Sequence, residues 1–510
     1  MTRVITMSAL LHIPIVTGNI WHRLLVVCCC ASLLACDRGS LSNEEQHAFR
    51  FAVAAAPLSL DPRLATDATS ERINHLLYRG LVEFDDARRP VPGLATWQQL
   101  TPQHYRFSMV NRGRRLADGR QLQARHVKAT YSFILDPTNA SPHRGNLAHI
   151  TRIEVLDKDH LDFHLARPDN LFPARLAIGI VSEDGQGGLL GSGAFRLHRG
   201  GPLHDVWLQR RRDGQLFRFL HIADPTVRVL KLLRGEIDML QNDLSPELIK
   251  YLAGQENLRL LTRPGTNFTY LGFNLDDAVT GQVELRRAIA LAIDRGALIR
   301  HLFAARARPA ASILPPEHWA GLAADQEQGF DPAAARRLLA GLGYTPDKPV
   351  KVIYKTSTDP LRLRIATVIR QQLAEVGIDI EIRSYDWGTF FADIKTGNFQ
   401  MYSLSWVGVR APDIFEYIFH SHSIPPVGAN RGRYRSRRAD DLIEAAIGET
   451  DTAAMTRRWQ ALQVQLLDDL PYVPLWYEHQ VFASREDVAG YRLGADGNYD
   501  GLNMIERITQ

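Results

Sequence analysis

Residues 350 to 417 alternate strand and helix patterns, and this order restricts the possible folds more than any other feature of the sequence. Short apolar stretches with a two-residue period predict strands, and each helix pattern follows an Asp that can cap its first turn. Strands are expected at Val350 to Lys355, Ile378 to Arg383 and Phe399 to Leu404, with helices beginning at Asp359 and Asp386. A β-α-β-α-β order predicts a mostly parallel sheet and therefore an α/β lobe.

The loop after the third strand is the expected ligand site. It contains a glycine and ends at Pro412 and Asp413, which open the next helix. In α/β proteins, ligands bind where the carboxyl end of a strand meets a helix N-terminus, because free N–H groups and the helix dipole point there. This loop is therefore expected to line a cleft between two lobes, with the binding residues Trp406, Gly408, Val409, Arg410 and Asp413.

The charge balance excludes one class of partner. The chain of 510 residues carries 60 Lys and Arg against 56 Asp and Glu. Its length is enough for two to four domains of roughly 150 residues each. A formal net charge of +4, spread along the chain, is too small for a nucleic-acid partner. We therefore expect no nucleic-acid binding.

The four cysteines lie near the N-terminus, in a processing signal rather than a disulfide framework. Arg23 is followed by the apolar stretch Leu24 to Leu34, which is too short to span a bilayer. Leu33-Leu34-Ala35-Cys36 resembles the lipobox of bacterial lipoproteins, in which the Cys is lipidated. We predict a signal peptide at 1–35, lipidation of Cys36 and a tether at 36–48. A plain anchor or a buried apolar strand is the alternative.

Asp37 follows the predicted lipidation site directly. An Asp at this position resembles the signal that retains enteric-type lipoproteins at the inner membrane. The sequence therefore places the protein on the periplasmic side of the inner membrane, held there by a lipid anchor on Cys36.

A series of short motifs between residues 49 and 480 occurs in the order that one protein family shows. Together the motifs resemble the peptide-binding solute receptors of ABC importers, the family 5 extracellular solute-binding proteins. Each motif alone is weak, and their common order carries the resemblance. The motifs are Leu60-Asp61-Pro62, Tyr78 to Asp85, Pro92 to Ala95, Leu116 to Gly119, Ala124 to Phe133, Gly191 to Leu197, Asp224 to Arg228, Leu233 to Asp238, Tyr270 to Asn274 and Leu285 to Arg295.

The resemblance implies an architecture and a set of partners. It implies an α/β, two-lobed periplasmic binding protein of the Venus-flytrap type, with mixed, mostly parallel sheets and an extra subdomain in the first lobe. Lobe I is expected at 49–265 plus 480–510, with the subdomain at about 90–190, and lobe II at 266–479. The implied partners are a peptide or peptide-like small solute and the permease and ATPase subunits of an ABC importer. The receptor is expected to be a monomer without a cofactor.

One motif departs from the family pattern. Peptide receptors of this family have W-x-x-D in the expected binding loop, and that Asp binds the α-amine of the ligand. With Trp406 aligned to the Trp, Val409 stands at the Asp position and Arg410 follows. Asp413 either replaces the missing acid or only caps the next helix. A Val beside an Arg favours a ligand without a free amine, or an anionic group that Arg410 holds through two hydrogen bonds.

Further binding candidates lie outside this loop. Tyr270 and Trp387, together with Trp406, are expected cleft walls, since aromatic rings give a large contact area with few rotamers to freeze. Packing in the core is the alternative for each of the three. Thr69 lies in a first-lobe loop that contacts ligand in relatives. The basic run from Arg431 to Arg438 is either a solvated face or a docking surface for the permease.

The sequence shows no recognisable catalytic motif. It has no H-E-x-x-H, G-x-S-x-G or P-loop pattern, so no catalytic residue and no enzymatic activity are expected. His420-Ser421-His422 offers two imidazoles to a metal, but no Cys or carboxylate ligand stands at a suitable spacing. No metal site is therefore expected.

The leading hypothesis is a lipoprotein receptor that captures oligopeptides or peptide-like solutes and delivers them to an inner-membrane permease. A receptor for a non-peptide solute, such as a metal chelate, an opine or a murein peptide, is the alternative that Val409 favours. A periplasmic enzyme and a lipoprotein scaffold without a transporter are two further alternatives.

Overall fold

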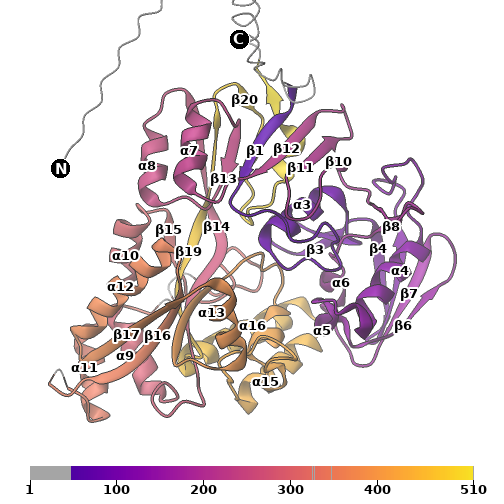
Figure 1. Cartoon of the computed structure of the whole chain (residues 1–510). Helices are drawn as coiled ribbons and strands as arrows, with labels where there is room; N and C mark the ends of the chain where they lie inside the picture. Colours follow the sequence, from indigo (N-terminus) through magenta and orange to yellow (C-terminus); the bar gives the residue numbers. More distant parts are fainter. Residues whose placement is uncertain (1–46, 324–325, 327, 346, 509–510) are drawn as a thin grey trace, which may run out of the picture. The chain divides into compact units, whose positions relative to one another are not determined.

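Two long neighbouring strands, β14 (Leu258–Phe273) and β19 (Tyr472–Arg485), run through the large sheet of the protein (Figure 1). They pair antiparallel over nearly their whole length. β13 (Met239–Gln241) pairs with one end of β19, and β18 (Met401–Trp406) pairs with the other end of β14. Strands from distant parts of the chain are thereby joined into one sheet of 11 strands.

The computed structural model describes residues 47–323, 326, 328–345 and 347–508. The predicted signal peptide, Cys36 and most of the predicted tether lie outside these residues and stay predictions. Among the helices that the structure describes, none has the length and apolarity that a membrane span requires.

The β13 side of the large sheet is built from the first part of the chain. Its strand order is β10-β11-β12-β1-β13, in which β1 pairs parallel with β12 and β13 while β10 to β12 form an antiparallel meander. Phe49 and Phe51 of β1 stack near Phe217 and Phe219 of β12 in the core of this side. The elements are β1 (Phe49–Val53), α3 (Ala68–Leu77), β10 (Phe195–Arg199), β11 (Val206–Arg210), β12 (Leu216–His221), α7 (Pro225–Leu233) and α8 (Pro246–Ala253).

The β18 side contains the β-α-β-α-β unit that the sequence predicts. β16 pairs parallel with both β17 and β18, so the predicted parallel arrangement of residues 350 to 417 is confirmed. The predicted caps are also present, because Asp359 and Asp386 accept hydrogen bonds from the backbone N–H groups of Arg362 and Thr389. The elements are β16 (Val350–Ser357), α12 (Pro360–Ala374), β17 (Ile378–Tyr385), α13 (Trp387–Thr396) and α14 (Ile414–Phe419).

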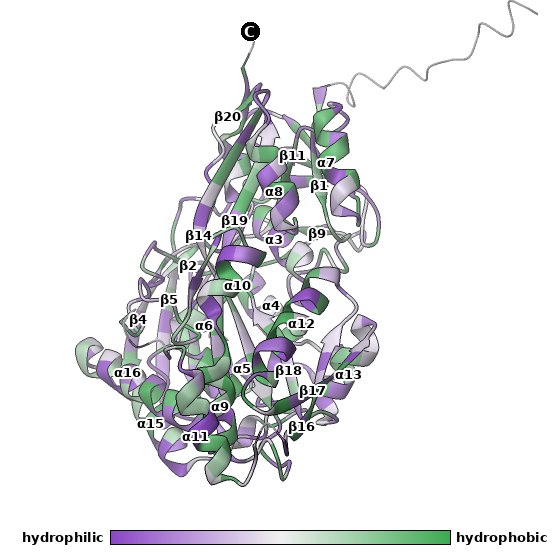
Figure 2. Ribbon diagram, turned by 90° about the vertical axis from the view of Figure 1, so that its left-hand side faces the viewer, coloured by the Kyte–Doolittle hydropathy of each residue, from purple (hydrophilic) through white to green (hydrophobic). Residues whose placement is uncertain are grey.

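Amphipathic helices cover this side, and Figure 2 shows hydrophilic and hydrophobic residues alternating along them. Leu285, Ile289 and Ala292 of α9 are buried, as their helical spacing predicts. They belong to an apolar cluster that also contains residues of β16, β17 and α12. The remaining elements here are α9 (Val283–Ala292), α10 (Arg295–Leu302), β15 (Ala307–Pro309), α11 (Pro332–Gly341), η3 (Ser421–Ser423), α15 (Arg437–Ile447) and α16 (Thr452–Asp469).

A second, four-stranded antiparallel sheet has the order β4-β5-β7-β6. One face carries the apolar residues Tyr105, Phe107, Leu161 and Phe163, which pack with residues of α4. The limits of this expected subdomain, like those of the lobes, stay predictions. The elements are β4 (Ala95–Thr101), β5 (His104–Met109), α4 (Ala124–Leu135), η1 (Pro137–Asn139), α5 (Arg144–Leu147), β6 (Ile150–Val155), β7 (His160–Leu165) and α6 (Phe172–Arg175); short strands elsewhere are β2 (Val82–Phe84), β3 (Pro90–Pro92), β8 (Ser182–Glu183), β9 (Leu189–Leu190), β20 (Val488–Ala489) and β21 (Glu506–Arg507), with η4 at Asp500–Met504.

The large sheet is mixed, as the sequence predicts, but parallel pairing is less extensive than expected. The parallel pairs in the large sheet are those of β1 with β12 and β13 and those of β16 with β17 and β18. The β14–β19 ladder and the β10–β12 meander are antiparallel. The reason is that β14 and β19 run in opposite directions through the sheet, so the strands on either side are added to an antiparallel centre.

Gly265 in the β14–β19 ladder gives a stability prediction. It lies where the register of the two strands shifts, between Arg263 and Asn267. A Cβ on this residue would lie 2.1 Å from the backbone oxygen of Glu478 on β19. We expect Gly265→Ala to lower the free energy of unfolding by about 1–3 kcal/mol, the usual cost of overpacking. Chemical denaturation followed by circular dichroism measures this change.

Gly341, the last residue of α11, is the matched control. A Cβ on Gly341 would meet no atom within 4 Å. Gly341→Ala is therefore expected to leave the free energy of unfolding unchanged or to raise it by up to about 1 kcal/mol, because Ala is the better helix former. Equal losses of stability in the two variants would contradict the close approach at Gly265.

Candidate functional site

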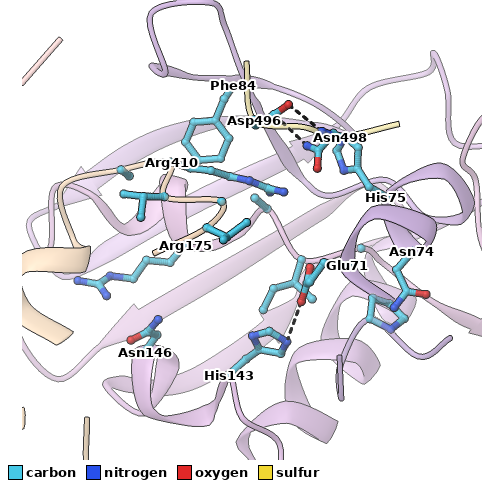
Figure 3. A pocket seen from close by; sticks show the side chains of 18 of the residues that line it. Glu71, Asn74, His75, Phe84, His143, Asn146, Arg175, Arg410, Asp496 and Asn498 are labelled. Atoms are coloured by element: carbon cyan, nitrogen blue, oxygen red, sulfur yellow. Dashed lines mark hydrogen bonds and ion pairs between the residues drawn. The ribbon is translucent and has the colours of Figure 1, made fainter. Parts of the chain in front are cut away.

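A cavity of about 420 Å³ lies beside the loop that follows β18. Most of its lining comes from five segments, namely one side of α3, the residues around α5, the end of α6 with the residues after it, the loop 407–414 and the segment 496–498. Figure 3 shows Arg410 reaching in from the loop after β18, with Glu71 and His143 facing each other nearby. Segments from the first, middle and last parts of the chain thus form one site.

Four of the residues predicted from the loop after β18 line this cavity: Gly408, Val409, Arg410 and Asp413. Gly408 has a φ of +72°, a left-handed conformation that favours glycine, and it turns the chain out of β18. Val409 is buried in an apolar cluster and brings no charge to the site. The structure therefore brings these four residues together, and their role in binding stays a prediction.

Arg410 is a half-buried cation without an anionic partner. Among the residues that the structure describes, no carboxylate oxygen lies within 4.0 Å of its guanidinium, which lies 5.9 Å from the centre of the Phe84 ring. Its backbone oxygen accepts a hydrogen bond of 3.2 Å from Nε2 of His318. Burial lowers the pKa of His318 to about 4, so this neutral imidazole holds the loop without adding charge. The guanidinium thus remains available to an anionic group.

Asp413 occupies the N-cap position of α14, but its side chain makes no capping hydrogen bond. One carboxylate oxygen lies 3.5 Å from Nη1 of Arg175, and the side chain is 19% exposed. Burial raises the pKa of Asp413 to about 6, although Arg175 acts in the opposite direction. The helix-cap interpretation therefore does not explain this side chain, which lies at the cavity beside a shared cation.

Arg175 is the buried cation that several acids share. It is 3% exposed and lies 2.7 Å from Asp169 and 3.1 Å from Glu416, in addition to its contact with Asp413. Burial would raise the pKa of Asp169, but Arg175 and His149 bring it down to about 2. Arg175 is thus committed to Asp169 and Glu416, and Asp413 has the longest of the three ion pairs.

Glu71 and His143 are site residues that the sequence analysis missed. Oε1 of Glu71 lies 4.0 Å from Nε2 of His143. The Glu71 side chain is 46% exposed, and desolvation by the surrounding protein raises its pKa while Arg410 opposes the shift. Burial lowers the pKa of His143, which favours a neutral imidazole. The cavity therefore has an acid on the α3 side as well as at Asp413.

The sequence does contain a signal for the α3 side of the site. Ala68, Glu71, Arg72 and His75 recur at helical spacing and all line the cavity. They flank the apolar stripe of α3, whose residues Ile73, Leu76 and Leu77 pack into the core. Thr69, the predicted contact, is buried and is not among the lining residues.

The C-terminal segment adds the last wall of the cavity. Asp496 pairs with Arg88 at 3.1 Å and accepts a hydrogen bond of 2.9 Å from the side chain of Asn498. Burial would raise the pKa of Asp496, but Arg88 and Arg410 bring it below its ordinary value. Asp496 is thus ionised and already paired. Neither residue was predicted, because no local motif marks this segment.

The three predicted aromatic walls lie outside the cavity lining. Tyr270 is fully buried and stacks on Tyr472, with ring centres 3.9 Å apart. Trp406 packs against the guanidinium of Arg431 at 4.8 Å. Trp387 is 58% exposed and stacks on the neighbouring Phe391. The alternative of core packing therefore describes Tyr270, and direct ligand contact by the other two stays a prediction.

Parts of the basic run and His420 of the histidine pair are engaged in local contacts. Arg431 lies between the rings of Trp406 and Phe391, and Arg435 pairs with Asp276 at 2.6 Å. His420 lies 3.3 Å from Glu444, so this histidine connects the end of α14 to α15. The first arginine of the run is thus not a freely solvated residue.

The chain matches the family model of the bacterial extracellular solute-binding proteins, family 5 (middle region), over residues 89–423. This match covers well over half of the chain, and the protein belongs to that family. Members of the family are transport proteins of the periplasm or the cell exterior. The family predicted from the ordered motifs is therefore confirmed.

Two relatives with known names illustrate the level of sequence identity. Di/tripeptide-binding protein 2 of Pseudomonas aeruginosa is 26% identical over 487 residues, which cover 86% of this chain and 91% of that protein. Glutathione-binding protein GsiB of Salmonella choleraesuis is 25% identical over 468 residues with the same coverage.

Solved structures agree in fold. The dipeptide-binding protein from Pseudoalteromonas sp. SM9913, in complex with Met-Leu, has a TM-score of 0.78 at 22% identity over 90% of this chain and 100% of that one. NikZ from Campylobacter jejuni, in complex with Ni(L-His), has a TM-score of 0.78 at 19% identity over 90% and 99%. The predicted fold class, a two-lobed periplasmic binding protein of the α/β type, is confirmed.

The raised pKa of Asp413 gives a prediction about pH. Because the carboxyl group has a pKa of about 6 in the folded protein against an ordinary 3.8, the folded state binds the proton more tightly. Stability contributed by this group is therefore full below pH about 4 and is lost as the pH rises through 6. We expect Asp413→Asn to raise the stability of the ligand-free protein near neutral pH by up to about 3 kcal/mol.

Thermal unfolding of both proteins between pH about 4 and pH about 8 measures this effect. The gain from Asp413→Asn should shrink as the pH falls, because the native acid is then protonated as well. A gain that does not depend on pH, or a loss of stability near neutral pH, would show that Asp413 is ionised at no cost in the folded protein.

Proposed function

We propose that this protein is the substrate-binding lipoprotein of an ABC importer, and that it captures small peptides or peptide-like solutes with both an acidic and a basic group. The observation that carries the proposal is the charge pattern of the cavity. Within the described part of the chain, no carboxylate lies within ion-pairing distance of Arg410, while desolvation raises the pKa values of Asp413 and Glu71. A guest with a carboxylate and an ammonium group satisfies both.

The volume of the cavity favours a short guest. At about 420 Å³, it lies toward the small end of the range of roughly 300–1,000 Å³ that is usual for small-molecule sites. The relatives named for di- and tripeptides and for glutathione support a solute of this size. A long oligopeptide would need a larger space between the lobes.

The two ends of the guest are assigned by charge. A carboxylate can accept two hydrogen bonds from the planar guanidinium of Arg410. An ammonium group at Asp413 would complete the ion-pair network around Arg175, whose attraction is divided among three acids. In a closed cleft an unpaired charge is costly, so each charge of the guest needs its partner. Asp413 thus takes the place of the acid that the family carries at the position of Val409.

The proposal includes closure of the two lobes around the guest. Arg410 and Asp413 come from the segment expected in lobe II, and Glu71 and His143 from lobe I. A guest that contacts both segments stabilises the closed form. We include lipidation of Cys36, attachment to the periplasmic side of the inner membrane, a monomeric state and delivery to a permease in this proposal. The protein itself performs no catalysis in this scheme.

A receptor for a non-peptide solute is the second candidate function. Val409 removes the acid that peptide receptors of the family use for the amine, and Arg410 adds a cation next to it. An anionic metal chelate, an opine or a murein peptide would use Arg410 without needing Asp413. Binding of a solute that lacks any ammonium group would favour this candidate.

The first test concerns the carboxylate. Calorimetric titration should show that Arg410→Ala weakens dipeptides or tripeptides with a free carboxylate by about 10–100-fold, the usual loss for a charged hydrogen-bonded pair. Arg437→Ala is the control, since this side chain is 91% exposed. C-terminal amidation should have little further effect on the Arg410→Ala protein. Fully additive losses would mean that Arg410 does not contact the carboxylate.

The second test concerns the amine. Asp413→Asn should lower the affinity for peptides with a free amine by about tenfold or more, and it should leave the affinity for N-acetylated peptides nearly unchanged. Glu71→Gln is tested in parallel to decide which of the two acids contacts the amine. Substitution of that acid should weaken binding of the free peptide and should have little effect once the amine is acetylated. If each substitution changes the affinity for free and acetylated peptides by the same factor, the amine lies elsewhere. This outcome would favour the non-peptide candidate.

A further inference from the structure

The outer face of the four-stranded sheet carries a cluster of imidazole and carboxylate groups. His104 on β5 lies opposite His164 on β7, and Asp162 lies two residues before His164 on the same strand. The apolar residues between them, such as Phe163, point to the other face and pack with α4. Strand register thus places two histidines and one acid side by side.

The distances within this cluster suit the coordination of a metal ion. One ligand atom from each of His104, Asp162 and His164 lies within 4.8 Å of the others. Nε2 of His104 is 2.9 Å from Oδ2 of Asp162, and the two imidazole rings stack with centres 4.2 Å apart. Ligands around a tetrahedral metal with bonds of about 2.0–2.1 Å lie about 3.3 Å apart, so small ring rotations would be enough.

We propose that His104, Asp162 and His164 bind a divalent transition metal ion such as Zn²⁺ or Ni²⁺. Two imidazole nitrogens and one carboxylate oxygen favour ions of borderline softness over Mg²⁺ and Ca²⁺, which prefer oxygen ligands. Glu154 on β6 lies 3.7 Å from Nε2 of His164 and is the nearest candidate for a fourth ligand. This site goes beyond the proposed function and does not depend on it.

Two arginines hold the cluster together without metal. Arg106 donates two hydrogen bonds to Asp162, and Arg152 contacts both His164 and Glu154. Arg106 is 41% exposed and Arg152 is 62% exposed. The pair of Arg152 with Glu154 is exposed and contributes little to stability, so Arg152 can move into solvent when a metal ion replaces it. The Asp162 side chain is only 5% exposed, so a metal ion that displaces Arg106 must take over the neutralisation of this buried carboxylate. The positive charge of the two arginines opposes the metal ion, and its removal should therefore tighten binding.

The site is separate from the cavity. No residue of β4, β5, β6 or β7 is among the described residues that line the cavity. A bound ion would link β5 to β7, which are already paired, and would leave the solute site unchanged. Metal binding and solute binding are therefore expected to be independent.

Calorimetric titration of the chain from residue 37 onward, without an affinity tag, tests the proposal with Zn²⁺ and Ni²⁺ near neutral pH. One ion should bind per chain, and His104→Ala and His164→Ala should each weaken that binding by at least about tenfold. His160→Ala is the matched control, because this histidine lies on the same face of β7 and pairs with Asp157. It should change the affinity less than about twofold.

Arg152→Ala keeps the test decisive even if a histidine variant is destabilised. It should tighten metal binding by about threefold or more, because one positive charge next to the ion is removed. Spectra of bound Cu²⁺ should show nitrogen ligands from two imidazoles in the wild type and from one in His164→Ala. Absence of saturable binding, or unchanged affinity in a His104→Ala/His164→Ala double variant, would overturn the proposal. In the second case the ion is bound by other histidines.

Discussion

The antiparallel pairing of β14 with β19 is the interaction on which the rest of the structure depends. Both strands are long enough to pair with each other and also with separate strands at their two ends. Their backbone hydrogen bonds therefore connect two halves of one sheet that otherwise come from different parts of the chain. The close approach at Gly265, where the register shifts, lets the two strands stay paired through this region. The loop after β18 takes its position from this ladder.

The charges of the cavity come from helices and loops that the fold brings together beside the loop after β18. Arg175 is buried with Asp169 and Glu416, and such a buried pair persists only when its hydrogen bonds are nearly complete. Asp413 shares the same cation at a longer distance and has a raised pKa. Arg410 stands near Glu71 but outside ion-pairing distance. In the proposed function, these charges of both signs bind a guest that carries both signs, and membership of a family of solute-binding proteins supports that proposal.

Charged groups have different surroundings in the cavity and on the outer face of the four-stranded sheet. In the cavity, burial makes the charges of Arg175 and Asp413 costly unless they are paired. On the outer face of the four-stranded sheet, Arg106 contacts Asp162 and Arg152 contacts His164, and both arginines are partly exposed to solvent. The proposed solute binding therefore depends on the proposed lobe closure, while the proposed metal site depends only on the register of neighbouring strands.

Local patterns were enough for much of the fold. The caps at Asp359 and Asp386, the strict alternation at Ile378 to Arg383 and the apolar stripe of α9 each depend on residues close in sequence, and each was found where expected. The extent of parallel pairing was overestimated, because the sequence of β14 or β19 alone does not determine the direction in which the two strands pair.

The loop after β18 shows which features could be predicted from the sequence and which could not. Its position, its glycine turn at Gly408 and the replacement of an acid by Val409 could be read from the sequence alone, since they concern consecutive residues. The partners of that loop could not, because Glu71, Arg175 and Asp496 are far from it in the sequence and meet it only in the folded chain. The sequence by itself determined the family, the repeating α/β unit and the loop. Only the tertiary structure decided which charges share the cavity, since charge pairing depends on distance in space and not along the chain.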